Sequence, residues 1–149
     1  MDKSFSLVNL LIAAAIVALP NSLFGATSPK PCNQSDHLKI VSLSIYPDPL
    51  TDAQHLERWD LRIRSESEEA CETPIRIVEV ERNIVAAQTN ALIETGANAI
   101  KLAPAPDYQF TANERCFNVV LTATESKSAT DDRQLFCAVR IDNRWWTMR

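Results

Sequence analysis

The sequence predicts an all-β protein, an antiparallel β-sandwich of about seven short strands. Short runs rich in β-branched, aromatic and apolar residues recur about every ten residues, and polar turn formers separate them. One of these runs alternates strictly between apolar and charged residues, which is the period of a half-buried strand. Beyond the first two dozen or so residues, no run carries a convincing helical pattern.

The beginning of the chain has the pattern of a secretory signal peptide. Lys3 precedes an uninterrupted apolar run over 10–19, and small and polar residues follow Pro20 up to a cleavage site after Gly25 or Ala26. A membrane span needs about 20 apolar residues, so this run is too short by itself. We therefore expect a signal helix that is removed, with no stable membrane span in the mature chain.

The expected organisation is a signal peptide over 1–26, an extended lead over 27–37 and a single β-sandwich domain over 38–149. The net charge of −4 shows no basic excess, so nucleic acid is not an expected partner. With two glycines in the chain, a glycine-rich phosphate loop of the usual form is excluded.

The first two expected strands cover 38–46 and 58–64, and both alternate in polarity. The second shows the clearest alternation of the chain, with arginines and an aspartate between the apolar positions, so one face is expected to be solvated. The inward residues are expected to be Val41, Leu43 and Ile45 in the first strand and Trp59, Leu61 and Ile63 in the second.

The later strands are expected over 73–82, 83–95 and 99–102, followed by a hairpin of 115–123 with 133–139. In the first of these, the apolar positions change face between Ile77 and Val78, which predicts a bulge or a strand covered on both sides. The segment 83–95 would also tolerate a helix, and strand is preferred because its neighbours are strands.

Four cysteines lie after the signal peptide, at Cys32, Cys71, Cys116 and Cys137. An even number in an exported chain predicts two disulfides and an oxidising compartment. A hairpin centred on 126–127 would put Cys116 and Cys137 nearly opposite each other, and the other two precede strands that start at the same end of the sandwich. The favoured pairing is therefore Cys32–Cys71 with Cys116–Cys137. No C-x-x-C pair is present, which argues against a zinc ribbon or a thioredoxin-like redox site.

At the level of architecture, the segment 38–141 resembles an immunoglobulin-like or fibronectin-like domain. It departs from the antibody pattern in two ways. No tryptophan lies between Cys71 and Cys116, and the position two residues before Cys116 is Glu114 rather than a corner tyrosine.

The first candidate binding surface is the tail with Trp145 and Trp146. Adjacent residues of a strand point to opposite faces, so one indole is expected to pack on the core while the other faces solvent. With Arg144 or Tyr108 nearby, an exposed tryptophan offers a surface that stacks on a sugar or anchors a partner. The alternative is that both indoles close the core or the sheet edge.

The second candidate surface is a row of arginines, Arg58, Arg62 and Arg64, on the solvated face of one strand, with Arg76 as an extension. Cross-strand pairing with Glu79 or Glu81 is the default interpretation. The sharper alternative is a face for an anionic ligand or acidic partner.

No catalytic residue, metal site or cofactor is expected. Two isolated histidines form no ligand pair, the G-x-S-x-G elbow is absent, and paired cysteines supply no nucleophile. The favoured function is therefore a non-catalytic binding or interaction role, periplasmic or secreted, with a partner protein or envelope component. The alternative is a carrier that holds an apolar or lipid ligand between its sheets, lined by Trp59, Phe117 and Phe136. A cavity of several hundred Å³ would favour the carrier, and a close-packed core would favour the binding protein.

Overall fold

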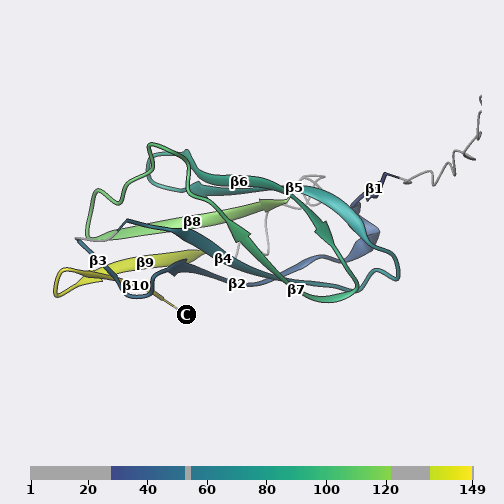
Figure 1. Ribbon diagram of the computed structural model, residues 1–149, viewed down its shortest axis with the longest axis horizontal. Helices are drawn as coiled ribbons and strands as arrows, with labels where there is room; N and C mark the ends of the chain where they lie inside the picture. Colours follow the sequence, from purple (N-terminus) through teal and green to yellow (C-terminus); the bar gives the residue numbers. More distant parts are fainter. Residues whose placement is uncertain (1–27, 53–54, 122–134, 149) are drawn as a thin grey trace, which may run out of the picture.

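The computed structural model describes residues 28–52, 55–121 and 135–148, which form two β-sheets packed face to face (Figure 1). The smaller sheet has the order β2 (Lys39–Tyr46), β4 (Arg58–Ser65) and β7 (Gly96–Leu102). All pairs in it are antiparallel. The predicted all-β sandwich is confirmed, and the expected signal helix lies outside the described residues.

The larger sheet has seven strands. In spatial order they are β6 (Ile84–Ile93), β5 (Cys71–Glu79), β8 (Glu114–Leu121), β9 (Phe136–Ile141), β10 (Arg144–Thr147) and β3 (Leu50–Thr51), with β1 (Lys30–Pro31) parallel to the start of β5. A short 3-10 turn, η1 (Gln34–Asp36), follows β1.

The strand order is immunoglobulin-like, with one difference from the constant-type domain. In that domain the fourth strand joins the sheet of the first, second and fifth strands. Here the corresponding strand β6 pairs with β5 from Cys71 to Glu79, so it belongs to the larger sheet. The smaller sheet is therefore left with three strands, β2, β4 and β7.

The polarity of β4 determines how the smaller sheet lies on the larger one. Trp59, Leu61 and Ile63 point inward and are almost fully buried, while Arg62 and Arg64 face solvent. The same alternation holds for Leu43 and Ile45 in β2. Val41 differs from the prediction, since it is 49% exposed. The cause is a register shift between Ile40 and Ser42, which turns this residue away from the core.

A bulge occurs in the pairing of β5 with β6 between Ile77 and Val78, where the sequence predicts one, but its extra residue is Ala86 of β6, and β5 itself alternates without interruption. Ile75 and Ile77 are fully buried. Val78 is half-buried on the outer face, opposite Asn118 of β8. The ambiguous segment that follows is a strand, as preferred from the sequence.

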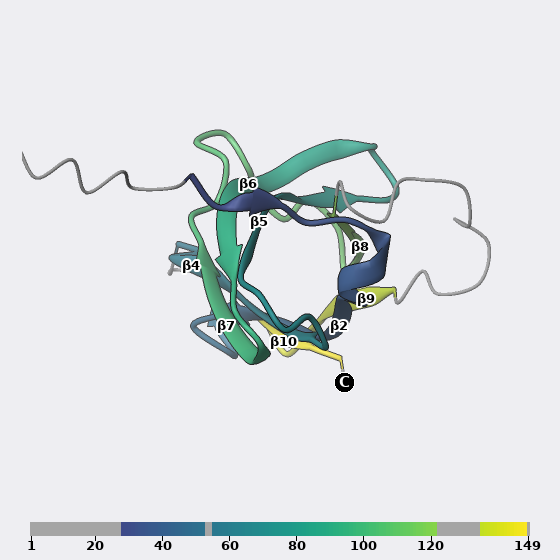
Figure 2. The ribbon, with the colours of Figure 1, turned by 90° about the vertical axis from the view of Figure 1, so that its right-hand side faces the viewer.

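Aromatic rings fill one end of the space between the sheets, and Figure 2 shows the two layers end-on. The Trp59 ring lies 4.7 Å from the Phe117 ring and 6.0 Å from the Tyr108 ring, centroid to centroid. Phe110 stacks on Trp145 at 4.5 Å. Tyr108 and Phe110 come from the loop between β7 and β8, so this loop covers that end of the core.

Candidate binding surfaces

Both disulfides have the predicted pairing, and they lie at opposite ends of β5. Cys32–Cys71 joins the lead to the first residue of β5, with a Cα–Cα distance of 4.8 Å. Cys116–Cys137 joins β8 to β9 between residues in direct register, with a Cα–Cα distance of 4.0 Å. Cys116 lies next to the far end of β5, since the backbone N–H of Val80 donates to the Cys116 carbonyl at 2.9 Å, an ordinary hydrogen-bond distance.

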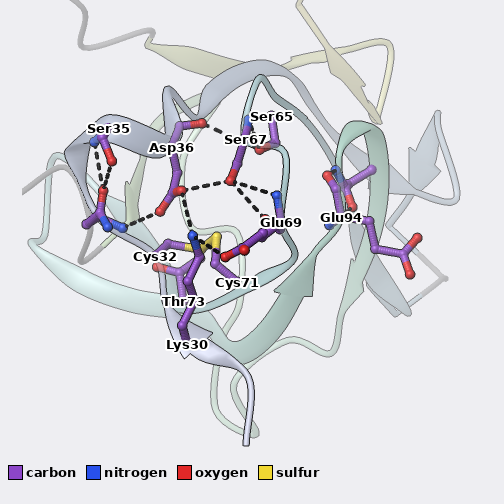
Figure 3. Close-up of a disulfide and its surroundings, with 12 residues drawn as sticks. Lys30, Cys32, Ser35, Asp36, Ser65, Ser67, Glu69, Cys71, Thr73 and Glu94 are labelled. Carbon is purple, nitrogen blue, oxygen red and sulfur yellow. Dashed lines mark hydrogen bonds and ion pairs between the residues drawn. A yellow bond between two sulfur atoms is a disulfide. The ribbon is translucent and has the colours of Figure 1, made fainter. Parts of the chain in front are cut away.

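A buried aspartate holds the lead beside the first disulfide (Figure 3). The backbone N–H of Asn33 and the Ser67 hydroxyl donate to the two carboxylate oxygens of Asp36, at 2.7 and 2.8 Å. The Lys30 ammonium lies 3.6 Å from the same carboxylate and 3.2 Å from that of Glu69. The backbone hydrogen bond from Asn33, followed by that from Ser67, lowers the pKa of Asp36. The contacts with Ser67 and Glu69 fasten the lead to the loop between β4 and β5, and those among Lys30, Asn33 and Asp36 hold the lead in its own conformation, so the cluster has a structural role.

A second buried carboxylate, Glu79, lies at the other end of β5. Arg82 donates to both of its oxygens, each at 2.5 Å, and the Tyr108 hydroxyl donates to Oε2 at 2.9 Å. Arg115 Nε lies 3.3 Å from Oε1. Arg82 also donates to the Gln109 carbonyl at 2.9 Å, so the loop between β7 and β8 is fastened to the end of β5.

This second cluster was not anticipated from the sequence. Burial acts to raise the pKa of Glu79, but the hydrogen bonds from Arg82 and Tyr108 outweigh it and hold the pKa below its ordinary value. Burial and the hydrogen bond to Glu79 raise the pKa of Tyr108. A carboxylate with all its donors in place and no open side to solvent has the features of a structural anchor.

The structure divides the four residues of the predicted tail surface into two groups. Trp145 and Tyr108 are buried in the aromatic end of the core. Trp146 and Arg144 are exposed on the outer face, where Trp146 pairs with Val139 and Arg144 pairs with Ile141. One indole thus packs inward and the other faces solvent, as the strand period predicts.

Trp146 belongs to a larger apolar area on the outer face of the seven-stranded sheet. We call this area the apolar band, and it crosses five strands through residues that the register places side by side. Its members are Trp146, Met148, Val139, Cys137, Cys116, Val80, Val78 and Val85. Met148 is 53% exposed and Trp146 is 41% exposed, so the band is open at its β10 end. The disulfide of β8 and β9 lies in the middle of the band.

The outer face of the three-stranded sheet is basic instead. We call its five cations, Lys39, Arg58, Arg62, Arg64 and Lys101, the basic face. Arg58 pairs with Asp60 at 2.9 Å, and its guanidinium lies 3.6 Å from the centroid of the Tyr46 ring. Among the described residues, no carboxylate forms an ion pair with the other four cations.

The structure corrects the expected surroundings of the arginine row. Arg76 lies on the outer face of the other sheet, opposite Val120, so it does not extend the row. Glu79 is buried in its own cluster, and Glu81 accepts the backbone N–H of Cys116 at 3.1 Å. The reason is topological, because β4 pairs with β2 and β7 and never with β5.

The residues expected to line a ligand cavity are packed against one another. Phe117 meets Trp59 edge to face, and Phe136 borders a small space between the sheets. That space is a cavity of about 10 Å³, bordered also by Ile45, Ala138 and Thr147. It is close to the smallest volume that holds a single water molecule.

Two groups of potential metal ligands occur among the described residues, and each consists of a disulfide and one carboxylate, Asp36 or Glu114. Sulfur atoms joined in a disulfide are not thiolates and are poor ligands. No helix in the described ranges is both long enough and apolar enough to cross a membrane. Comparison of the chain with protein-family models, with curated proteins and with solved structures finds no match.

Proposed function

We propose that the chain is an exported, non-catalytic interaction protein, periplasmic or secreted, and that a partner protein docks on the apolar band. The observation that carries the proposal is the exposure of Trp146 and Met148 at one end of the apolar band, whose apolar residues run from β10 to β6 beside the polar residues Glu114 and Asn118 of the same face. Contiguous exposed apolar patches are rare on monomeric proteins and mark interaction sites. Tryptophan is also among the residues that dominate binding energy at interfaces.

The two disulfides indicate an oxidising environment, which supports an exported protein. The hydrogen-bonded carboxylates Asp36 and Glu79 each serve to fasten a loop, which supports a binding role over a catalytic one. The carrier alternative receives less support, because the cavity between the sheets measures about 10 Å³ whereas ligand pockets usually measure about 300 Å³ or more.

The experiment compares two double variants of the purified chain with the unmodified protein. W146S/M148S removes the exposed end of the apolar band, and V41S/Y46S removes one aliphatic and one aromatic side chain exposed on the other sheet. All four side chains are exposed or half-exposed, so unfolding free energies are expected to change by about 0.5 kcal/mol or less per site. Each immobilised protein is exposed to envelope and secreted fractions of the source cells, and retained proteins are quantified by mass spectrometry.

The expected result is a specific protein that the unmodified chain and V41S/Y46S retain and W146S/M148S loses. Retention that is the same for all three proteins would contradict the proposal. Light scattering of the pure chain tests whether a second copy of the chain, instead of a partner protein, covers the apolar band. A dimer that W146S/M148S dissociates would replace the partner protein with a second copy and so would overturn this assignment.

A further inference from the structure

The basic face carries an excess of positive charge, although the chain as a whole is acidic. The whole chain carries 15 Lys and Arg against 19 Asp and Glu, yet five cations and a single carboxylate lie on this one face. Asp60 is engaged with Arg58, which leaves Lys39, Arg62, Arg64 and Lys101 without a described carboxylate partner. A surface of this kind carries a positive potential even on an acidic protein.

The arrangement of these cations also opposes folding. Lys39 of β2 lies directly opposite Arg64 of β4, and like charges in direct register destabilise a sheet. Arg62, two residues from Arg64, adds to the same repulsion. A ligand that brings negative charge to this face would remove the repulsion, so anion binding and folding favour the same arrangement.

The cations form an elongated strip rather than a pocket. Successive outward residues of β4 are about 6.8 Å apart, so the strip from Arg64 to Arg58 is about 20 Å long. Lys39 flanks one end of the strip, and Lys101 flanks its middle opposite Asp60. A linear polymer with repeated negative charges fits such a strip better than one small anion does.

The residues between the cations indicate the kind of polymer. Ser42, Ser44 and Ala99 lie in register with β4 on the same face, so the surface is flat and offers hydroxyl groups. The large apolar side chains exposed along β2 are Val41 and Tyr46, and the Tyr46 ring is covered on one side by Arg58. Insertion into a bilayer needs an apolar face, which this strip lacks. Hydrated, hydroxyl-rich chains with acidic groups need no such face.

We infer that the outer face of β2, β4 and β7 binds a linear acidic polysaccharide, whose carboxylate or sulfate groups pair with Arg62 and Arg64 and are supported by Lys39 and Lys101. Guanidinium groups suit this role, because each presents two parallel N–H donors to a carboxylate or sulfate. This site is independent of the apolar band, which lies on the opposite sheet. Polysaccharide binding on the basic face can therefore be absent while partner binding on the apolar band is present, and the reverse.

The test uses the full chain with polyuronate as the probe and neutral dextran as the uncharged reference, measured by affinity electrophoresis and calorimetry. R62Q/R64Q removes two cations from the basic face. R76Q/R144Q removes the same charge from the other sheet and serves as the matched control. We expect R62Q/R64Q to weaken polyuronate binding about tenfold, and the control to bind within about twofold of the unmodified chain. Binding should also weaken as salt rises, and dextran should not bind.

An equal loss in both variants would overturn the inference, because binding would then follow net charge instead of this face. Absence of polyuronate binding would also overturn it, unless dextran sulfate binds with the same dependence on Arg62 and Arg64, which would identify a sulfated polymer of the same class. Tighter binding to phosphatidylglycerol vesicles or to DNA than to polyuronate would assign the face to a different ligand and reject the polysaccharide. Thermal unfolding of R62Q/R64Q, expected at an unchanged or higher temperature, separates these outcomes from misfolding.

Discussion

The two ends of the sandwich are built from the same two parts, a disulfide and a buried carboxylate, but the parts are combined differently. At the end near Cys71, the disulfide and Asp36 both hold the same segment, the lead that contains β1 and η1. At the end near Glu79, the disulfide joins β8 to β9, while the carboxylate holds a different segment, the loop between β7 and β8. The first end is therefore doubly fastened, whereas each part of the second end has a separate task.

The two carboxylates also differ in the groups that surround them. Asp36 accepts neutral backbone and hydroxyl donors and has one ammonium nearby. Glu79 is fully buried between two arginines and a tyrosine. A charge cluster that loses its central partner leaves other charges in a poorly solvated place, which is costly. The comparison predicts that replacement of the Glu79 carboxylate is less well tolerated than replacement of the Asp36 carboxylate.

Removal of the disulfides is expected to have the largest effect on stability. The residue separations are 39 and 21, so loss of loop-closure entropy predicts about 4 kcal/mol for C32S/C71S and about 3 kcal/mol for C116S/C137S. Urea unfolding of both double variants measures these values. A larger loss for C116S/C137S would show that the register of β8 with β9 depends on its disulfide, and would reverse the order.

Replacement of Glu79 is expected to have the next largest effect on stability after removal of the disulfides. E79Q keeps the size of the side chain but removes the charge between Arg82 and Arg115, and should lower the unfolding free energy by about 3 kcal/mol. The folded pKa of Glu79 lies below its ordinary value of 4.5. Its contribution is thus fully present above that value and is lost as pH falls through the folded pKa. Urea unfolding at pH 7 and pH 3 should therefore show less acid sensitivity in E79Q than in the unmodified chain.

The smallest of these effects is expected for Asp36. D36N removes the negative charge beside Lys30 and one of the two oxygens that accept from Asn33 and Ser67, but Cys32–Cys71 still holds the lead. The folded pKa of Asp36 is also lowered, so its contribution too is present above the ordinary value of 3.8 and is lost in acid. Unfolding of D36N in the background of C32S/C71S gives the sharper result. If the double fastening is real, the substitution costs more stability there than in the disulfide-bonded chain.

Much of the fold can be predicted from residue patterns that are local in the sequence. The alternation around Trp59 and the spacing of Cys116 and Cys137 each concern neighbours in one strand or one hairpin. Such signals survive folding because the strand period of two dictates which residues face inward. The outward turn of Val41 was missed because the bulge that causes it follows from no residue pattern in β2.

The Glu79 cluster shows what local patterns do not contain. Its members come from β5, the turn after it, the loop before β8 and β8 itself, so their meeting depends on strand order. One signal was available, since Glu79 shares the parity of the inward residues Ile75 and Ile77. The neighbours of the arginine row were wrong for the same reason, because the sequence does not state that β4 lies between β2 and β7.

The opposite orientation of Trp145 and Trp146 has an optical consequence. Trp59 and Trp145 lie in the aromatic end of the core, where water and soluble quenchers have little access, whereas the Trp146 indole is open to both. The red side of the intrinsic emission spectrum therefore originates mainly from a single indole, and that indole belongs to the apolar band. The chain contains its own fluorescent label at the surface where we propose that a partner docks, and no dye has to be attached to follow that encounter.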